Sequence, residues 1–467
     1  MEFLTTITQN THVGYPLIFF YLVAVVGIIL VIFRPYWAFL FALFCLAARN
    51  FHAAVFTRTP FAGPYLNLND LLLWITLFAM VFELIRTRKM VWMPKILFAI
   101  FILIIIGDIV SLFKYGTEGF VLRRIWSTAI FPILFLISAN IVKNEKRAKL
   151  FYWVFFVGAV FAAIQHMIFI KSVTSGDMFV GITEIRIISY TASGGLFLII
   201  SAIFVKPDKA LNRFRLISYY VGIALIALSY ILSLTRGIYV VGILTLVVFP
   251  FLLRGKYTII KGAYKFAIGV FLVLFLVQIL SPNFDFKGIL NQRFKSFITK
   301  DAFSRAYATR LMGQKTELDL WTNGIIIFGE GSSLPPEYES AEPEITGALY
   351  HVAYSTYLAH YGLVGLFLYG FLLPMSTILA ARKYYFKYTM GYGGKIALIA
   401  IACALFDVFS LPTGRHYLFA TSHMSGLIYG AIWGLYRSMK VEKRAIAFYK
   451  YRQPALSSSP VIQKYGN

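Results

Sequence analysis

The sequence predicts an all-α, polytopic membrane protein with about 12 or 13 transmembrane helices and one large external loop that contains short helices. Three observations lead to this fold class. The chain of 467 residues is 59% hydrophobic, has a mean hydropathy of +0.74 and contains only 14% charged residues. Its apolar residues gather in runs about long enough to cross a bilayer. One long polar segment, residues 281–352, interrupts these runs. The composition excludes a soluble globular protein and a disordered chain.

The apolar runs form a series along the whole chain. A helix crosses the hydrocarbon core with roughly 20 apolar residues. The second run is the shortest, and if it is re-entrant the chain has twelve spans instead of thirteen. The predicted spans are residues 16–33, 35–50, 67–85, 94–113, 125–142, 150–170, 189–205, 216–234, 237–253, 264–280, 353–381, 395–411 and 417–437.

These spans divide the chain into four regions. Residues 1–280 hold transmembrane helices 1 to 10, and residues 281–352 form the large external loop. Residues 353–437 hold transmembrane helices 11 to 13, and residues 438–467 form a cytoplasmic tail that we expect to be disordered from Val441 onward. We find no internal repeat and no low-complexity segment. Residues 1–15 contain no Lys or Arg, so we expect the first run to be a retained span and not a cleaved signal peptide.

The net charge of +24 has a topological explanation. Most of the 44 Lys and Arg residues fall in alternate short connections and in the tail after Tyr436. Cytoplasmic loops of membrane proteins are enriched in basic residues, so these connections are predicted to be cytoplasmic and the long loop external. With thirteen spans, the C-terminus lies inside and the N-terminus outside. The positive charge therefore gives no reason to expect a nucleic acid partner.

Ionisable residues gather at the external ends of the predicted spans, where they are costly and, by default, functional. They are Asp70, Asp108, Arg123, Arg124, Arg236, His351, Asp407, Arg415 and His416. We infer that they converge on a polar cavity that opens toward the outer leaflet. Structural alternatives exist, because Asp70 suits a helix cap and Arg123, Arg124 and Arg415 suit interfacial anchors. Arg236 lies in the short turn SLTRG, which has no structural need of a guanidinium.

The external loop contains a predicted helix in the segment SRAYATRLMGQKTELDLW, with Asp301 or Ser304 as its cap. This segment carries Arg305 and Arg310 on the water side of the membrane. An apolar stripe at helical spacing suits a helix that lies on the membrane surface or on the bundle. The stripe consists of Phe303, Tyr307, Leu311, Leu318 and Trp321. The stretch GEGSSLPPEYESAEPE that follows is a turn-rich, acidic loop.

Motifs of other enzyme classes are missing from the sequence. It contains no HExxH, CxxC, GxSxG or P-loop pattern. Cys45 and Cys403 lie in apolar runs and offer neither a disulfide framework nor metal-ligand spacing. The external acids form no carboxylate pair that aims at one point, because Glu317 and Asp319 face different ways on a helix. We therefore expect no metal ion and no other cofactor.

With Arg236 and His351, the chain resembles the superfamily of O-antigen ligases and O-antigen polymerases. Members have a tight external turn of Ser-x-Arg-Gly character and a periplasmic loop with an arginine in a helix. That loop ends in a histidine, and an apolar span with a Gly-x-x-Gly step follows. The matching features here are SLTRG, Arg310, the turn from Gly329 to Gly331, and His351 leading to Gly362 and Gly365. The resemblance covers about residues 216–437. Val352 and His360 depart from the family pattern.

The resemblance implies that a glycan is transferred from a polyprenyl (undecaprenyl) diphosphate carrier to an acceptor hydroxyl. The reaction would take place at the outer face of the bacterial inner membrane, facing the periplasm. Arg236 and Arg310 would clamp the diphosphate, and His351 would orient or deprotonate the acceptor. We expect the other external ionisable groups to contact substrate. They are Arg305, Arg123, Arg124, Arg415, His416, Asp70, Asp108 and Asp407.

Three functions remain open from the sequence. A ligase would use lipid A-core as acceptor, and a polymerase would use a second lipid-linked glycan. The histidine-ending loop favours the ligase. A transporter or flippase of lipid-linked glycans belongs to another class, and it would place charges and broken helices near the bilayer midplane with repeat symmetry. Here the charges concentrate externally. In all three cases the partners are a carrier-linked glycan and membrane lipids.

Overall fold

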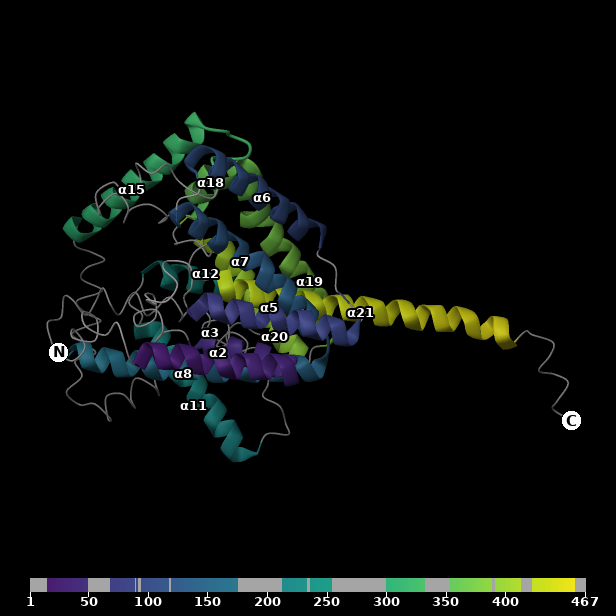
Figure 1. Ribbon diagram of the computed structural model, residues 1–467. Helices are drawn as coiled ribbons and strands as arrows, with labels where there is room; N and C mark the ends of the chain where they lie inside the picture. Colours follow the sequence, from purple (N-terminus) through teal and green to yellow (C-terminus); the bar gives the residue numbers. More distant parts are fainter. Residues whose placement is uncertain are drawn as a thin grey trace, which may run out of the picture.

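A computed structural model describes residues 15–48, 68–88, 90, 94–116, 119–174, 212–232, 236–253, 300–331, 353–388, 391–412 and 422–457. Within these ranges the chain forms helices joined by short turns and contains no strand. Figure 1 shows most of the helices gathered in a bundle, with α15 at the upper left and the end of α21 projecting to the right.

The N-terminal helices follow the predicted spans closely. Local signals define several of their ends, since Pro35 begins one helix and Gly116, with a φ of 75°, ends another. The helices are α2 (Tyr15–Phe33), α3 (Pro35–Ala47), α5 (Leu68–Thr87), α6 (Lys95–Tyr115), α7 (Gly119–Ile141) and α8 (Glu145–Thr174).

The C-terminal helices include one long element in three parts. Residues 353–387 form α18, a stretch of π-helix and α19 without an intervening loop. The helices are α11 (Arg213–Leu232), α12 (Arg236–Leu252), α15 (Lys300–Asn323), α18 (Ala353–Gly365), η3 (Leu366–Leu372), α19 (Leu373–Lys387), α20 (Tyr392–Ser410) and α21 (Ser422–Ser457).

Several of these helices are long and apolar enough to cross a membrane. In the described part of the chain they are Lys95–Lys114, Glu145–Gln165, Tyr354–Lys387 and Tyr392–Ser410. Shorter apolar helices cover Tyr21–Phe33, Pro35–Ala47, Ala129–Ile141 and Val240–Leu252. The chain is an all-α, polytopic membrane protein. The predicted spans 189–205 and 264–280 lie outside the described residues, so the count of 12 or 13 spans stays a prediction.

Helices α7 and α21 pack against each other along a row of glycines. An ideal Cβ on Gly430 would lie only 2.2 Å from the carbonyl oxygen of Phe135, so a larger residue would force the helices apart. Small residues four apart allow close helix packing in membranes, where lipid tails remove the hydrophobic drive between helices. The row consists of Gly426, Gly430 and Gly434.

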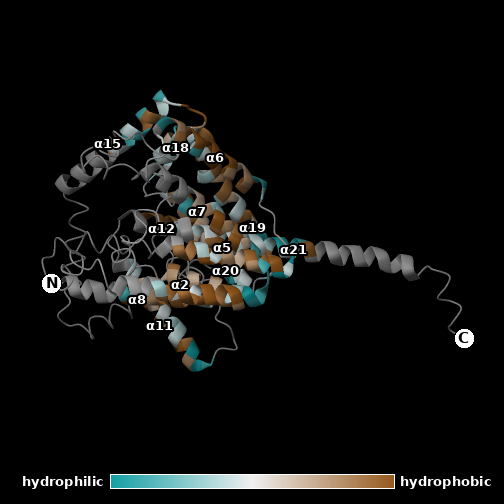
Figure 2. Cartoon of the chain, viewed as in Figure 1, coloured by the Kyte–Doolittle hydropathy of each residue, from teal (hydrophilic) through white to brown (hydrophobic). Residues whose placement is uncertain are grey.

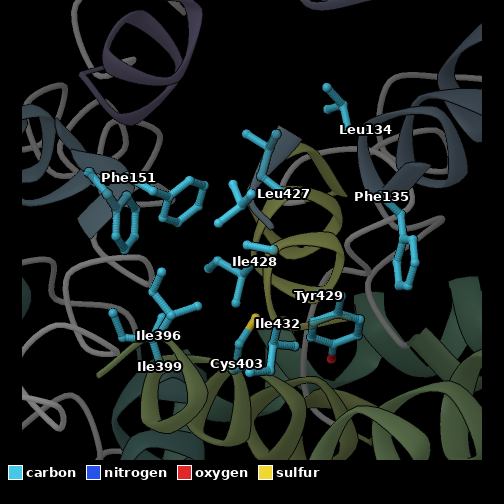
Figure 3. Packing of buried hydrophobic residues seen from close by; sticks show 14 of the residues in the cluster. Leu134, Phe135, Phe151, Ile396, Ile399, Cys403, Leu427, Ile428, Tyr429 and Ile432 are labelled. Atoms are coloured by element: carbon cyan, nitrogen blue, oxygen red, sulfur yellow. The ribbon is translucent and has the colours of Figure 1, made fainter. Parts of the chain in front are cut away.

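Helix α20 lies inside the bundle, and α6 lies at its edge. In the apolar window of α20, 83% of the residues are buried, whereas the corresponding share in α6 is 33%. Figure 3 shows side chains of the core around α20 and α21, among them Ile396, Ile399, Cys403, Ile428 and Ile432. The outer face of α6 is therefore free to contact lipid.

Two acids, one buried and one exposed, join helices on the side of the bundle that is predicted to be cytoplasmic. Glu83 on α5 is buried and forms an ion pair with Arg147 on α8. The carboxylate of Glu145 accepts the backbone N–H groups of Tyr392 and Gly393 at the start of α20. The buried Glu83 needs such a partner, because an unpaired carboxylate in a dry interior is costly.

Two features of the C-terminal half differ from the prediction. The segment 353–381 was expected to be one continuous helix, but the backbone leaves the helical conformation at Gly362. The tail was expected to be disordered from Val441 onward, but α21 continues as a helix to Ser457. The sequence VEKRAIAF explains the second difference, because Glu, Lys, Arg and Ala have high helix propensity.

Candidate functional site

The predicted helix of the external loop is present as α15, and it packs on α18. Its buried positions include Gly313 and Glu317, whereas Leu311 of the predicted apolar stripe is exposed. Asp319 is also exposed, so Glu317 and Asp319 face different ways, as predicted. The contact with α18 is therefore built around a buried acid and not only around apolar side chains.

Glu317 holds the first turn of α18. It is buried, with 1% of its surface exposed. The hydroxyl of Thr356 donates to Oε1 at 3.0 Å, and the hydroxyl of Ser355 donates to Oε2. One turn earlier on α15, the side-chain amide of Gln314 bonds the hydroxyl of Tyr354. Three consecutive residues of α18 are thus bonded to one face of α15.

This contact bears on two predicted catalytic residues. Arg310, Gln314 and Glu317 are spaced i, i+4 and i+7, so these positions share one face of α15. α18 begins at Ala353, two residues after His351. The backbone of α15 therefore carries the Arg310 position toward the beginning of α18. His351 itself lies outside the described residues.

The helix break at Gly362 lies beside the turn that follows α15. Gly362 has a φ of 62° and a ψ of −160°, a conformation that only glycine adopts readily. The break frees backbone groups on both sides of it. The N–H groups of Leu363 and Val364 bond to the carbonyl oxygens of Ile326 and Ile327, each at 3.1 Å.

The carbonyl groups freed above the break are also satisfied. Glu330 N–H donates to the carbonyl of Ala359 at 2.8 Å, and Gly331 N–H donates to that of His360 at 2.9 Å. Irregular backbone at membrane depth is tolerated only where such groups are bonded. The turn and the broken helix therefore complete each other's backbone hydrogen bonds.

His360 adds a side-chain contact to the same turn. Its ring is buried, and Nδ1 lies 2.6 Å from the carbonyl oxygen of Gly331. A carbonyl oxygen only accepts hydrogen bonds, so Nδ1 carries the hydrogen. The family resemblance drew attention to His360 only as a departure from its pattern. In the structure His360 belongs to the contact between the turn after α15, residues 324–331, and the broken helix around Gly362, which we call the junction.

An ion pair closes the junction against α6. Glu330 is buried and pairs with Lys114 near the end of α6, and its Oε1 also accepts the N–H of Ile325 at 3.3 Å. The turn packs tightly here, because an ideal Cβ on Gly331 would lie 2.3 Å from Ser111 Oγ. Asp108, one of the predicted site residues, lies one turn before Ser111 and is half-buried.

Asp407 lies in the core beside the junction. It is buried on α20, and the hydroxyl of Tyr429 on α21 donates to its Oδ2 at 2.5 Å. The end of α20 meets the start of α18, where Tyr354 N–H donates to the carbonyl of Leu411 at 3.2 Å. The end of α20, which carries Asp407, thus meets the first turn of α18.

Stacked aromatic rings fill the space between Asp407 and the broken helix. Tyr369 stacks on Tyr357 and Tyr361, with ring centroids 5.4 and 6.1 Å apart. Phe131 lies edge-on to Tyr369 at 6.2 Å and to Tyr429 at 5.9 Å. All five rings are buried. They form a rigid support between the core and the junction.

The remaining predicted site residues are located less fully. Only the backbone is described for Asp70 on α5, Arg123 and Arg124 on α7, Arg236 at the start of α12, and Arg305 and Arg310 on α15. His351, Arg415 and His416 lie outside the described residues. The polar cavity that these residues would form together therefore stays a prediction.

The structure adds residues that sequence reasoning did not select. They are Lys114, Glu330, His360 and Glu317. Each one interacts with a residue far away in the sequence, so no local pattern marks it. Among the described residues, no three His, Cys, Asp or Glu side chains are grouped so that they could hold a metal ion.

Comparison with known proteins does not assign a family to this chain. Neither a protein-family model nor a curated protein matches its sequence.

Proposed function

We propose that this protein is a membrane glycosyltransferase of the O-antigen ligase type. It transfers a glycan from a polyprenyl diphosphate carrier to an acceptor hydroxyl, with its site facing the periplasm from the bacterial inner membrane. One observation supports this proposal most directly. The face of α15 that includes the Arg310 position is bonded through Gln314 and Glu317 to the first turn of α18, directly after His351.

The chemistry of this proposal needs a cation and a base at one place. The acceptor oxygen attacks the anomeric carbon, and the bond from that carbon to the diphosphate breaks. The hydroxyl proton goes to the imidazole of His351. The carrier leaves as the free diphosphate, whose developing charge is stabilised by the guanidinium groups of Arg310 and Arg236.

The structure offers less support for the transporter reading. Transporters use the backbone groups of broken helices to bind substrate near the bilayer midplane. Here the groups freed at Gly362 are bonded to the turn after α15, namely those of residues 359, 360, 363 and 364. These four groups of the broken helix are therefore used to pack it against the turn, which favours the transferase proposal over a transporter.

A polymerase remains the second candidate within the same reaction class. The two enzymes differ only in the acceptor, and the residues of the junction serve either one. The acceptor must therefore be determined by experiment.

The test combines a purified reaction with a deletion strain. Purified protein in proteoliposomes should release free polyprenyl diphosphate from a lipid-linked glycan when an acceptor is present, and the His351→Ala variant should not. Normal activity of an inserted His351→Ala variant would contradict the proposed mechanism. In the deletion strain, loss of all long-chain lipopolysaccharide indicates a ligase, whereas chains with a single repeat indicate a polymerase. Unchanged chains would contradict both.

A further inference from the structure

The turn after α15 exposes a run of large apolar side chains. Ile325, Ile326, Ile327 and Phe328, here called the apolar tip, have 44, 48, 54 and 44% of their surface exposed. Their exposure is enforced, because the backbone of the tip is bonded to α18 through Ile326 O and Ile327 O. Four adjacent apolar side chains in water are unfavourable, so the tip needs a partner.

The length of the broken helix indicates where the tip lies relative to the membrane. The apolar helix covers Tyr354–Lys387, which is 34 residues and longer than a bilayer core requires. Basic residues mark its end, beginning with Arg382. About 20 residues, or about 30 Å, separate Arg382 from Gly362. If Arg382 lies at one membrane surface, the break and the tip lie at the other.

Helix α6 independently places the apolar tip at the same membrane surface. Its apolar stretch Lys95–Lys114 has 20 residues, the length of one crossing, with a lysine at each end. Lys114 is bonded to Glu330, just after the tip. We call this surface the loop side of the membrane. Both helices place the tip at the boundary between headgroups and acyl chains on the loop side.

The tip also continues the apolar surface of the bundle. Leu363, whose N–H bonds the tip, is 48% exposed, and Phe367 on the next turn is 60% exposed. The outer face of α6 carries a similar row, formed by Ile102, Ile105, Ile106, Ile109 and Phe113. In Figure 2 the apolar turn after α15 lies beside the strongly hydrophobic α6. These rows contact lipid in a membrane-spanning bundle, and the tip extends them.

We propose that the apolar tip is a membrane anchor that inserts into the loop-side leaflet of the bilayer. Its partner is the lipid at the acyl–headgroup boundary, where partly buried apolar side chains bind reversibly. The anchor would hold α15 close to the membrane surface, together with the junction to α18. This inference concerns lipid contact only and goes beyond the proposed transferase activity. The anchor can therefore be tested independently of that activity.

Site-directed spin labelling in proteoliposomes tests the anchor. The labels are placed at Ile327→Cys and, in a second variant, Ile326→Cys, in a background without the two native cysteines (Cys45→Ala, Cys403→Ala). Asp319→Cys on the exposed face of α15 is the water control, and Ile105→Cys on α6 is the lipid control. Collisions of the labels with oxygen, which is enriched in lipid, are compared with collisions with a water-soluble nickel chelate.

We expect labels at 326 and 327 to collide at least three times more often with oxygen than with the chelate, as at 105. The label at 319 should show the reverse. A chelate-dominated signal at 326 and 327 would overturn the proposal, because the tip would then lie in water. Low collision with both reagents and dipolar broadening between labels would also overturn it, because the tip would then bind a second copy of the chain.

Discussion

The carbonyl oxygen of Ile327 lies too close to the backbone of Gly362 to leave room for a Cβ at position 362. An ideal Cβ on Gly362 would lie 2.3 Å from that oxygen. The oxygen has little freedom to move, because it accepts the N–H of Val364 at 3.1 Å. The left-handed backbone of Gly362, with a φ of 62°, adds a second penalty for a side chain. Glycine at this position therefore allows the turn after α15 to pack against the broken helix.

Gly362→Ala should therefore destabilise the protein strongly. We expect the free energy of unfolding to fall by more than about 2 kcal/mol, since the clash and the backbone strain act together. Thermal unfolding in detergent, followed by tryptophan fluorescence, measures this. Gly370→Ala is the matched control in the same broken helix, because its Cβ would meet only side chains, at 3.3 Å or more. Equal stability of the two variants would contradict the backbone joint.

Glu317→Ala should loosen the contact between α15 and α18. It removes the buried carboxylate that accepts hydrogen bonds from the hydroxyls of Ser355 and Thr356, and we expect a loss of about 2 to 3 kcal/mol in stability. Glu317→Gln keeps one acceptor oxygen and should lose less. Asp319→Asn, two residues away and exposed, should change nothing. If transfer activity is also measured, Glu317→Ala should lower it, whereas unchanged activity would separate this contact from catalysis.

Lys114→Met alone should lower the free energy of unfolding more than the double variant Lys114→Met, Glu330→Gln does. The single variant leaves a buried carboxylate without its cation, which is unfavourable by about 1 to 3 kcal/mol. The double variant removes the charge and keeps an acceptor for Ile325 N–H. A double-mutant cycle on unfolding free energies measures the coupling. Additive losses would mean that the ion pair contributes nothing to the junction.

Arg310→Lys should lower the rate of glycan transfer by at least about tenfold, although the charge is kept. A guanidinium binds two diphosphate oxygens at once with a planar fork, and an ammonium cannot. The assay is release of free polyprenyl diphosphate by purified protein. Lys315→Arg, on the exposed side of α15, is a control for charge exchange on this helix. Full activity of Arg310→Lys would rule out bidentate binding by this residue.

Glycan transfer should continue in excess EDTA. The proposed mechanism stabilises the diphosphate with arginines and assigns no step to a divalent cation. The purified protein is assayed with a lipid-linked donor before and after chelation, and again after magnesium or manganese is added. Activity lost to EDTA and restored by either ion would show that acids such as Asp70 or Asp108 hold a metal.

The helices could be predicted from sequence because the bilayer imposes their length and composition. The helix of the external loop was also predicted, and Glu317 and Asp319 face apart as expected. Its expected cap was wrong, because Asp301 and Ser304 both lie within α15, and Leu311 of the expected apolar stripe is exposed. The close packing of α7 and α21 was not predicted, although the four-residue spacing of Gly426, Gly430 and Gly434 is visible in the sequence. A search for small residues at this spacing would have found it.

The junction could be predicted only in part. Gly362 was recognised as part of a motif, but its break depends on carbonyl oxygens some 35 residues earlier in the chain, at Ile326 and Ile327. Glu330 and Lys114 are separated by 216 residues. Asp407 was expected at an open cavity, and the structure shows it buried against Tyr429. Hydropathy and spacing report local order, whereas these contacts depend on how distant helices meet.

The junction between the turn after α15 and the broken helix is held largely by hydrogen bonds between peptide groups, and this affects which residues can be substituted there. Peptide N–H and carbonyl groups are common to nearly all residues, so the four backbone bonds do not depend on which side chains stand at 326, 327, 359 or 360. The glycines at 329, 331 and 362 have almost no such freedom. Substitutions at 326, 327, 359 or 360 can therefore change the chemistry that the loop presents to lipid or substrate, while the backbone bonds keep the turn and α18 in the same register.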